Sequence, residues 1–200
     1  FSDAPLNDKR ITAEACVHHL FFDDRDYEQK GTLIKCNPAI KSPQDRSALL
    51  EALKTNRIDT IGTDHAPHTL TEKNKLYFKA PSGIPLAQHA LTSLLNGYHH
   101  GDISLELIAE KTAHAPADLF QMDGRGYIRE GYWADLAIVD PNRPWTVTND
   151  TLLSKCGWSP FEGRQFSHSV ASTWVNGVMA WDGKEVVNAN ASMPIEFDRS

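Results

Sequence analysis

Cysteine is scarce in this sequence. Cys16, Cys36 and Cys156 are the only three among 200 residues, and their odd number and wide spacing exclude a disulfide framework and a zinc-type cysteine pair. We therefore predict buried, reduced thiols, which are typical of cytoplasmic proteins. An apolar run of the roughly 18 residues that a membrane-spanning helix needs is also missing, and no signal peptide is visible. Because residue 1 is Phe rather than Met, we expect the native N-terminus to lie further upstream.

A large excess of charge of one sign is also absent. The formal net charge is -6, with 40% hydrophobic and 23% charged residues, which are ordinary values for a soluble globular protein. This mildly acidic balance argues against nucleic acid or an anionic membrane as the main partner. A length of 200 residues is enough for one domain, or for a domain with a smaller module.

The first part of the chain has the pattern of a parallel α/β unit. Ser42 and Pro43 mark a helix start, since they supply a capping hydroxyl and a proline at the first helical position. A compact strand that ends in small residues follows this helix, and the order strand, helix, strand predicts parallel pairing. The predicted strands or extended pieces are 11–17, 32–36 and 58–63, and the predicted helices are 42–56, 85–99, 104–113 and 116–120.

The pattern changes after residue 122. Short β candidates separated by turn residues replace the helices, and Asn176-Gly177 and Asp182-Gly183 are typical of tight hairpin turns. We therefore divide the chain into an α/β part, 1–122, and a β-rich part, 123–200. The β candidates are 126–128, 134–139, 145–147 and 172–181.

The residues most suggestive of chemistry follow the strand that we predict over 58–63. In an α/β barrel, the carboxyl ends of the strands and the loops after them form the active site. Asp64 therefore lies at a strand tip, where its carboxylate could bind a divalent metal and accept a proton from a metal-bound water, and His68 lies further into a polar loop that continues over 69–84. The alternative is that Asp64 only caps the turn and that His65 and His68 are solvated.

The other histidines carry weaker signals. His18 and His19 end the strand predicted over 11–17, where adjacent side chains point to opposite faces, so they make a poor metal pair and a structural or supporting role is favoured. His99 and His100 end a helix, where the helix dipole favours a cation. The remaining single histidines are predicted to be structural or at the surface: His89, His114 and His168.

Several segments together resemble the dihydroorotases of the amidohydrolase superfamily. The most specific is Thr63-Asp64-His65-Ala66-Pro67-His68, because the related allantoinases and hydantoinases share the Asp-His pair but usually carry another residue at position 68. The resemblance covers nearly the whole chain and includes segments 13–20, 35–41, 80–84, 131–140, 154–155, 159–163 and 173–177.

The resemblance implies a fold, a reaction and roles for named residues. The fold would be the C-terminal part of a TIM-like (β/α)8 barrel with part of a small β domain. The reaction would be the zinc-dependent, reversible cyclisation of N-carbamoyl-L-aspartate to dihydroorotate in pyrimidine biosynthesis, in the cytoplasm, with a small molecule as partner and a homodimer as one expected assembly. Asp64 would be a ligand of one of two zinc ions and the catalytic acid/base. Asn37 and His68 would bind the substrate, and the backbone at Ser82 and Gly83 would contact its ring, although Ser82 replaces an expected Phe.

The resemblance also has a gap. The family's remaining metal ligands include a His-X-His on the first strand with an accompanying Arg, and neither occurs in these 200 residues. We therefore expect this chain to be the C-terminal portion of a longer polypeptide and not to catalyse alone. Two alternatives stay open: another cyclic amidase, such as an allantoinase or dihydropyrimidinase, and an inactive dihydroorotase-like protein that acts as a structural partner.

Overall fold

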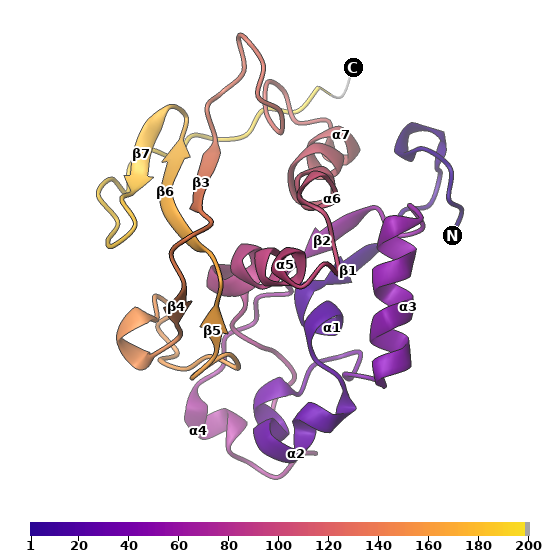
Figure 1. Cartoon of the computed structure of the whole chain (residues 1–200), viewed down its shortest axis with the longest axis vertical. Coiled ribbons are helices and arrows are strands. Elements are labelled where there is room, and N and C mark those ends of the chain that lie inside the picture. The colour runs from indigo at the N-terminus through magenta and orange to yellow at the C-terminus, as the bar shows by residue number, and fades with distance from the viewer. Residues whose placement is uncertain (199–200) are drawn as a thin grey trace.

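A pair of parallel strands forms the centre of the α/β part. The computed structural model describes residues 1–198. Strand β1 (Glu14–Cys16) pairs with β2 (Thr60–Gly62), so that Cys16 faces Gly62. Helix α3 (Pro43–Lys54) connects them and lies against α1 (Val17–Phe21), as Figure 1 shows. The predicted α/β order is therefore confirmed.

Helix α3 begins where its sequence predicts. The Ser42 hydroxyl accepts a hydrogen bond from the Asp45 amide at 3.3 Å, and the Asp45 carboxylate accepts one from the Ser42 amide at 3.1 Å. This reciprocal capping box satisfies amide groups that the first helical turn leaves without partners. The other α-helices are α2 (Tyr27–Lys30), α4 (Leu70–Lys73), α5 (Ala90–His99), α6 (Leu105–Ala109) and α7 (Ala115–Phe120). A π-helical turn at Glu110–His114 joins α6 to α7.

Several predicted elements differ from the structure: the helices predicted over 85–99 and 104–113 are α-helical only over Ala90–His99 and Leu105–Ala109, and three further segments differ in kind or length. The segment predicted as extended over 32–36 begins as a 3-10 helix, Gly31–Ile34, whose Ile34 is fully buried. The strand predicted over 11–17 is only Glu14–Cys16 long, since Val17 already begins α1. No strand forms over 126–128 in the described part of the chain. Short apolar runs do not distinguish a strand from a buried turn by periodicity, which explains the errors over 32–36 and 11–17.

The β-rich part contains a three-stranded antiparallel sheet in the order β3-β6-β7. Its strands are β3 (Leu136–Asp140), β6 (Ser169–Val175) and β7 (Val178–Trp181), and a separate pair joins β4 (Trp145–Thr146) to β5 (Gln165–Phe166). Asn176 and Gly177 both have positive φ, 51° and 79°, as the turn between β6 and β7 requires. The division at residue 122 stays a prediction, and residues 199–200 of the predicted β-rich part lie outside the described residues.

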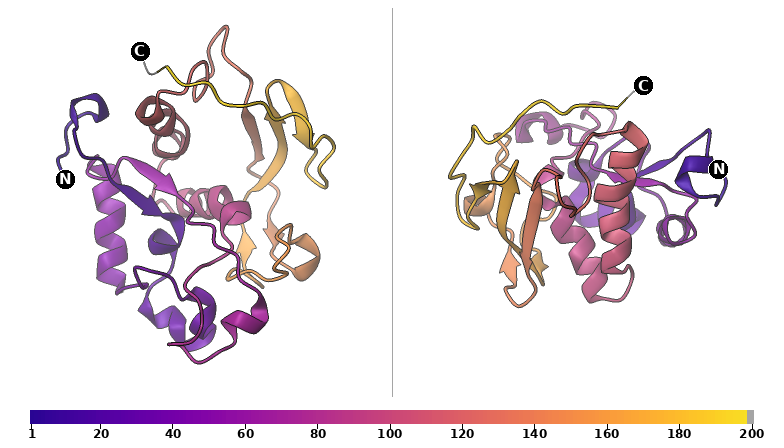
Figure 2. Two further views of the ribbon diagram at one scale, coloured as in Figure 1. Left: turned by 180° about the vertical axis from the view of Figure 1, so that it is seen from behind. Right: turned by 90° about the horizontal axis from the view of Figure 1, so that it is seen from above.

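The two parts share one hydrophobic core. Phe161, from the β-rich part, stacks on Phe22 with ring centroids 5.1 Å apart and meets Phe21 edge-on at 4.9 Å. Val147 and Phe166 are fully buried in the same cluster as residues of β1 and α5. Figure 2 shows the sheet lying alongside the helices in both views. The β-rich part therefore contributes directly to the packing around the α/β part.

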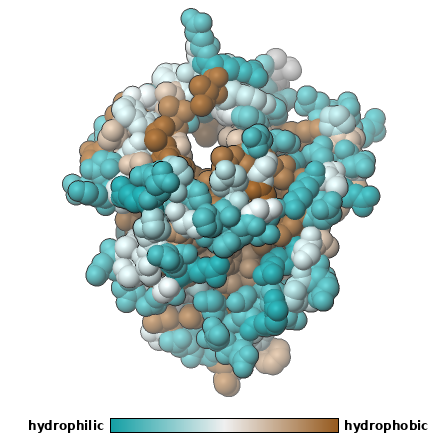
Figure 3. Space-filling model, in the orientation of Figure 1, coloured by the Kyte–Doolittle hydropathy of each residue, from teal (hydrophilic) through white to brown (hydrophobic). Residues whose placement is uncertain are grey.

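Apolar side chains also reach the surface. Figure 3 shows brown patches around an opening between the three-stranded sheet and the helical part. Ile128 is 90% exposed, and Ile138 and Phe120 are about half exposed at 46% and 52%. Within the described residues, no helix has both the length and the apolar character needed to cross a membrane.

Candidate active site

Asp64 lies just beyond the carboxyl end of β2. It is exposed and has a φ of 45°, a left-handed conformation that Asp tolerates better than most residues. The next residue turns back toward the fold, since the Nδ1 atom of His65 accepts hydrogen bonds from the amides of Leu86 at 2.9 Å and Ala87 at 3.0 Å. His65 therefore anchors the turn, and Asp64 stays at the open edge of the strand pair.

His68 and the segment at Ser82 and Gly83 are brought together, although they are 14 residues apart. The Nε2 atom of His68 lies 3.2 Å from the Ser82 carbonyl oxygen. Gly83 has a φ of 147°, and a Cβ atom there would lie 2.7 Å from the Ala66 carbonyl oxygen and 2.9 Å from the His68 ring. Only glycine fits this close approach. Three of the predicted site residues therefore occupy one small region.

A buried lysine that sequence reasoning missed holds this region in place. Lys73, at the end of α4, is fully buried and donates to the carbonyl oxygens of Lys35, Pro81 and Gly83 at 3.1, 3.0 and 2.8 Å. Burial lowers the pKa of Lys73 to about 8, and the three carbonyl oxygens stabilise the ammonium form at neutral pH. A Thr69-Glu72 capping box marks the start of α4 in the sequence, but nothing local shows that Lys73 points inward.

The same network reaches the segment of Asn37. The Lys35 carbonyl oxygen accepts from Lys73 and also from the Gly83 amide at 3.0 Å. Asn37 follows two residues later, is exposed, and precedes Pro38 through a cis peptide bond. The structure thus links the Asn37 segment to the Ser82-Gly83 segment through backbone contacts of Lys35.

A residue of the β-rich part completes the support of His68. The indole Nε1 of the buried Trp158 donates to the His68 carbonyl oxygen at 2.7 Å, across 90 residues of sequence. The Lys73 ammonium lies 5.9 Å from the centre of the same indole ring. The loop that carries His68 is therefore fixed from two sides, by α4 and by the tail.

These residues alone do not form a two-zinc centre. In the described range 1–198, a single group of three His, Cys, Asp or Glu side chains places its ligand atoms within 4.8 Å of one another, and Asp64 is not in it. One carboxylate cannot hold a pair of ions, because zinc sites use three or four protein ligands. The donors present around Asp64 therefore do not fit the pair of zinc ions that the resemblance implies.

The group that does meet this distance limit contains Cys16, His18 and His19. The prediction that His18 and His19 make a poor metal pair assumed a strand, and this premise is wrong because both residues lie in α1. Neighbouring helical positions do not alternate between opposite faces, and the two imidazole rings lie 4.2 Å apart.

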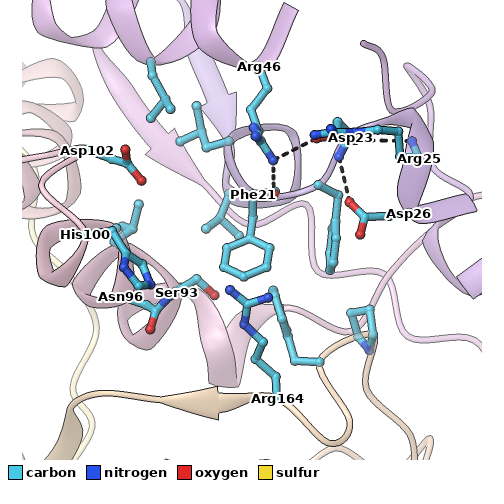
Figure 4. A pocket seen from close by; sticks show the side chains of 18 of the residues that line it. Phe21, Asp23, Arg25, Asp26, Arg46, Ser93, Asn96, His100, Asp102 and Arg164 are labelled. Carbon is cyan, nitrogen blue, oxygen red and sulfur yellow. Dashed lines mark hydrogen bonds and ion pairs between the residues drawn. The ribbon is translucent and has the colours of Figure 1, made fainter. Parts of the chain in front are cut away.

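A separate pocket of about 580 Å³ lies near α1 and α5. Figure 4 shows its polar lining, where Arg46 donates to the Phe21 carbonyl oxygen and forms an ion pair with Asp23 at 3.0 Å. Hydrogen bonds from Arg25 lower the pKa of Asp23 to about 2. Neither Asp64 nor His68 lines this pocket, so it is not part of the candidate active site.

Comparison with known proteins places the chain in a family. The profile of the amidohydrolase family matches residues 5–180. This chain belongs to the amidohydrolase family.

Among curated proteins, the chain is similar to several dihydroorotases. The chain is 43% identical over 175 residues to a dihydroorotase of Halobacterium salinarum. This match covers 88% of the present chain and 41% of the relative. It is 37% identical to a dihydroorotase of Clostridium acetobutylicum, over 87% of this chain and 41% of the relative. A third dihydroorotase, from Methanothermobacter thermautotrophicus, is 34% identical over 94% of this chain and 43% of its own length. The chain thus spans about two fifths of these relatives.

Solved structures support the fold. An L-hydantoinase (dihydropyrimidinase) from Arthrobacter aurescens superposes with a TM-score of 0.86 at 28% identity, over 91% of this chain and 42% of that structure. A D-hydantoinase from Thermus sp. gives a TM-score of 0.82 at 23% identity, over 92% of this chain and 42% of that structure. The predicted fold class, part of an amidohydrolase barrel, is therefore confirmed.

Proposed function

We propose that this chain provides the C-terminal side of the active site of a dihydroorotase, which interconverts N-carbamoyl-L-aspartate and dihydroorotate. The observation that carries the proposal is the arrangement beyond the carboxyl end of β2, where Asp64 follows the strand, His68 meets Ser82, and the Gly83 amide bonds to the segment of Asn37 through Lys35. The similarity to curated dihydroorotases over most of the chain supports it. We further propose that the enzyme depends on zinc and acts in cytoplasmic pyrimidine biosynthesis, with a homodimer as its assembly.

Asp64 is the acid/base in this proposal. Its carboxylate is exposed at the strand end, where it can accept the proton of an attacking water and return it to the amide nitrogen that leaves the opened ring. His68 and Asn37 would contact the substrate, and the backbone at Ser82 and Gly83 would contact its ring. Because the donors around Asp64 do not fit a zinc pair, we assign no step to zinc here; the remaining ligands would come from residues outside these 200.

A hydantoinase or dihydropyrimidinase is the second candidate, because the structural neighbours carry those names. His68 favours the first candidate, since an imidazole at this position can bind the substrate carboxylate that dihydroorotate has and hydantoin lacks. Both candidates can be compared in the native polypeptide that contains this sequence, with dihydroorotate, hydantoin, dihydrouracil and allantoin as substrates. Faster turnover of any of the other three than of dihydroorotate would reject the first candidate, and no turnover of any would favour the inactive structural partner.

Two variants separate the proposed roles. We expect Asp64→Ala to abolish turnover of dihydroorotate and His68→Ala to raise KM more than it lowers kcat, because the first residue moves a proton and the second binds substrate. Lys75→Ala, a change of an exposed residue in the loop after α4, is the control and should leave both constants unchanged. An Asp64→Ala variant with nearly full activity would show that another group is the acid/base.

A further inference from the structure

Three potential metal ligands meet at the junction of β1 and α1. Cys16 is the last residue of β1, and His18 and His19 follow within the first turn of α1. The Cys16 sulfur and a nitrogen from each imidazole all lie within 4.8 Å of one another. The ligand atoms of a tetrahedral zinc ion are separated by roughly 3.3–3.8 Å, given bonds of about 2.0–2.3 Å. Side-chain movements on the order of 1 Å therefore suffice to bring the three atoms around one ion.

His18 has a nitrogen that lacks a partner. The residue is 1% exposed, and its buried Nδ1 atom has no hydrogen-bond partner among the described residues. The unprotonated form of an imidazole carries a lone pair on one ring nitrogen, and among the described residues no donor competes for Nδ1 of His18. A buried polar atom without a partner is unfavourable by about 1–3 kcal/mol, and coordination to a metal ion is one way to satisfy it.

His19 is oriented in the manner of a metal-bound histidine. Its Nε2 atom lies 2.9 Å from the Pro38 carbonyl oxygen. When Nε2 carries the proton and donates to this carbonyl, Nδ1 keeps its lone pair, and metal-binding histidines commonly donate their second nitrogen to a carbonyl or carboxylate. The Cys36 sulfur lies 3.8 Å from the same Nε2, on the ring edge that faces away from Nδ1.

We propose that Cys16, His18 and His19 together form a zinc-binding site. One thiolate and two imidazoles are donors that suit zinc, whereas magnesium and calcium prefer oxygen. Binding deprotonates the Cys16 thiol, forms a zinc–sulfur bond and releases one proton to solvent. Water would occupy the fourth position.

Cobalt reports directly on such a site, because Co²⁺ replaces Zn²⁺ and a coordinated thiolate gives a charge-transfer absorption band. We would titrate the metal-free 200-residue protein with Co²⁺ and then with Zn²⁺. The expected result is one Co²⁺ per chain with a thiolate band that Zn²⁺ removes. A wild-type protein without this band overturns the proposal, whatever the variants do.

Matched variants locate the ion. Cys16→Ser and His18→Gln should weaken Co²⁺ binding at least tenfold, and Cys16→Ser should also remove the thiolate band. Cys156→Ser changes a thiol outside the group, so this variant should bind as the wild type does. Retention of the band in Cys16→Ser, or its loss in Cys156→Ser, would overturn the assignment. Far-UV circular dichroism checks that each variant is folded.

Discussion

Replacing Lys73 by Met is the sharpest test of how the candidate active site is held together. Methionine has a similar length but no charge and no donor. The Lys35 carbonyl oxygen would keep the Gly83 amide as a partner at 3.0 Å. The carbonyl oxygens of Pro81 and Gly83, which accept from Lys73 at 3.0 and 2.8 Å, would lose its ammonium group.

The expected loss follows from these two acceptors. Each buried polar group left without a partner is unfavourable by about 1–3 kcal/mol, and the removal of a desolvated charge offsets part of this cost. We therefore expect Lys73→Met to lower the free energy of unfolding by about 2–4 kcal/mol. Lys75→Met, two residues away and exposed, is the control and should stay within about 0.5 kcal/mol of the wild type. Urea unfolding followed by circular dichroism measures both.

The effect of Lys73 on stability should also depend on pH, in a direction that its lowered pKa determines. The pKa of Lys73 is about 8 in the folded protein, below its ordinary value of 10.5, so between these values the unfolded chain binds more protons than the folded one. Stability contributed by Lys73 therefore rises with pH across this window. Other groups also titrate in this window. The quantity to follow is therefore the free energy of unfolding of the wild type minus that of Lys73→Met, which should increase from pH 8 to pH 10. If Lys73→Met equals Lys75→Met in stability and this difference is flat, Lys73 does not hold the site.

Three further predictions concern a close backbone approach, a buried ion pair and a helix cap. Gly83→Ala should destabilise the fold by about 1–3 kcal/mol, and by more than Gly131→Ala does. Both glycines have positive φ, but only Gly83 has neighbours that an added Cβ would clash with. Thermal unfolding compares the two variants, and equal losses of stability would contradict the close-approach argument. Asp59→Ala should cost about 3–5 kcal/mol, because the buried Lys9 ammonium, 2.5 Å from the carboxylate, would keep the Asn56 carbonyl oxygen but lose its counter-charge. Denaturant titration measures this, and a loss under about 1 kcal/mol would refute it. Ser42→Ala should cost about 1 kcal/mol through the α3 cap, and an unchanged urea midpoint would count against it.

Features fixed by local chemistry could be predicted from the sequence. Ser42 and Pro43 identify the start of α3 because a capping hydroxyl and a proline act within one turn. Asn176-Gly177 identifies the β6–β7 hairpin because few residues adopt positive φ at two successive positions. The position of Asp64 at a strand end followed from the compact strand before it. The roles proposed for Asn37, His68, Ser82 and Gly83 stay predictions.

Features fixed by distant contacts could not be predicted. Lys73 looks like an ordinary surface lysine in the sequence, and only the folded loop brings three carbonyl oxygens to its ammonium. The start of α1 at Val17 was missed because Cys16 makes no side-chain capping bond that would mark it. The proximity of His18 and His19 to Cys16 depends on that helix, so the wrong local structure removed the basis for judging these histidines as metal ligands.

The hydrogen bond from Trp158 to the His68 carbonyl bears on how this protein can be dissected. A cut at residue 122 would divide the chain where its secondary-structure pattern changes. It would nevertheless remove the indole that fixes the loop of His68 and the Phe161 ring that packs against Phe21 and Phe22. The tail is therefore not an interchangeable module. Chimeras that exchange it between relatives must keep both aromatic contacts if the loop of His68 is to retain its shape.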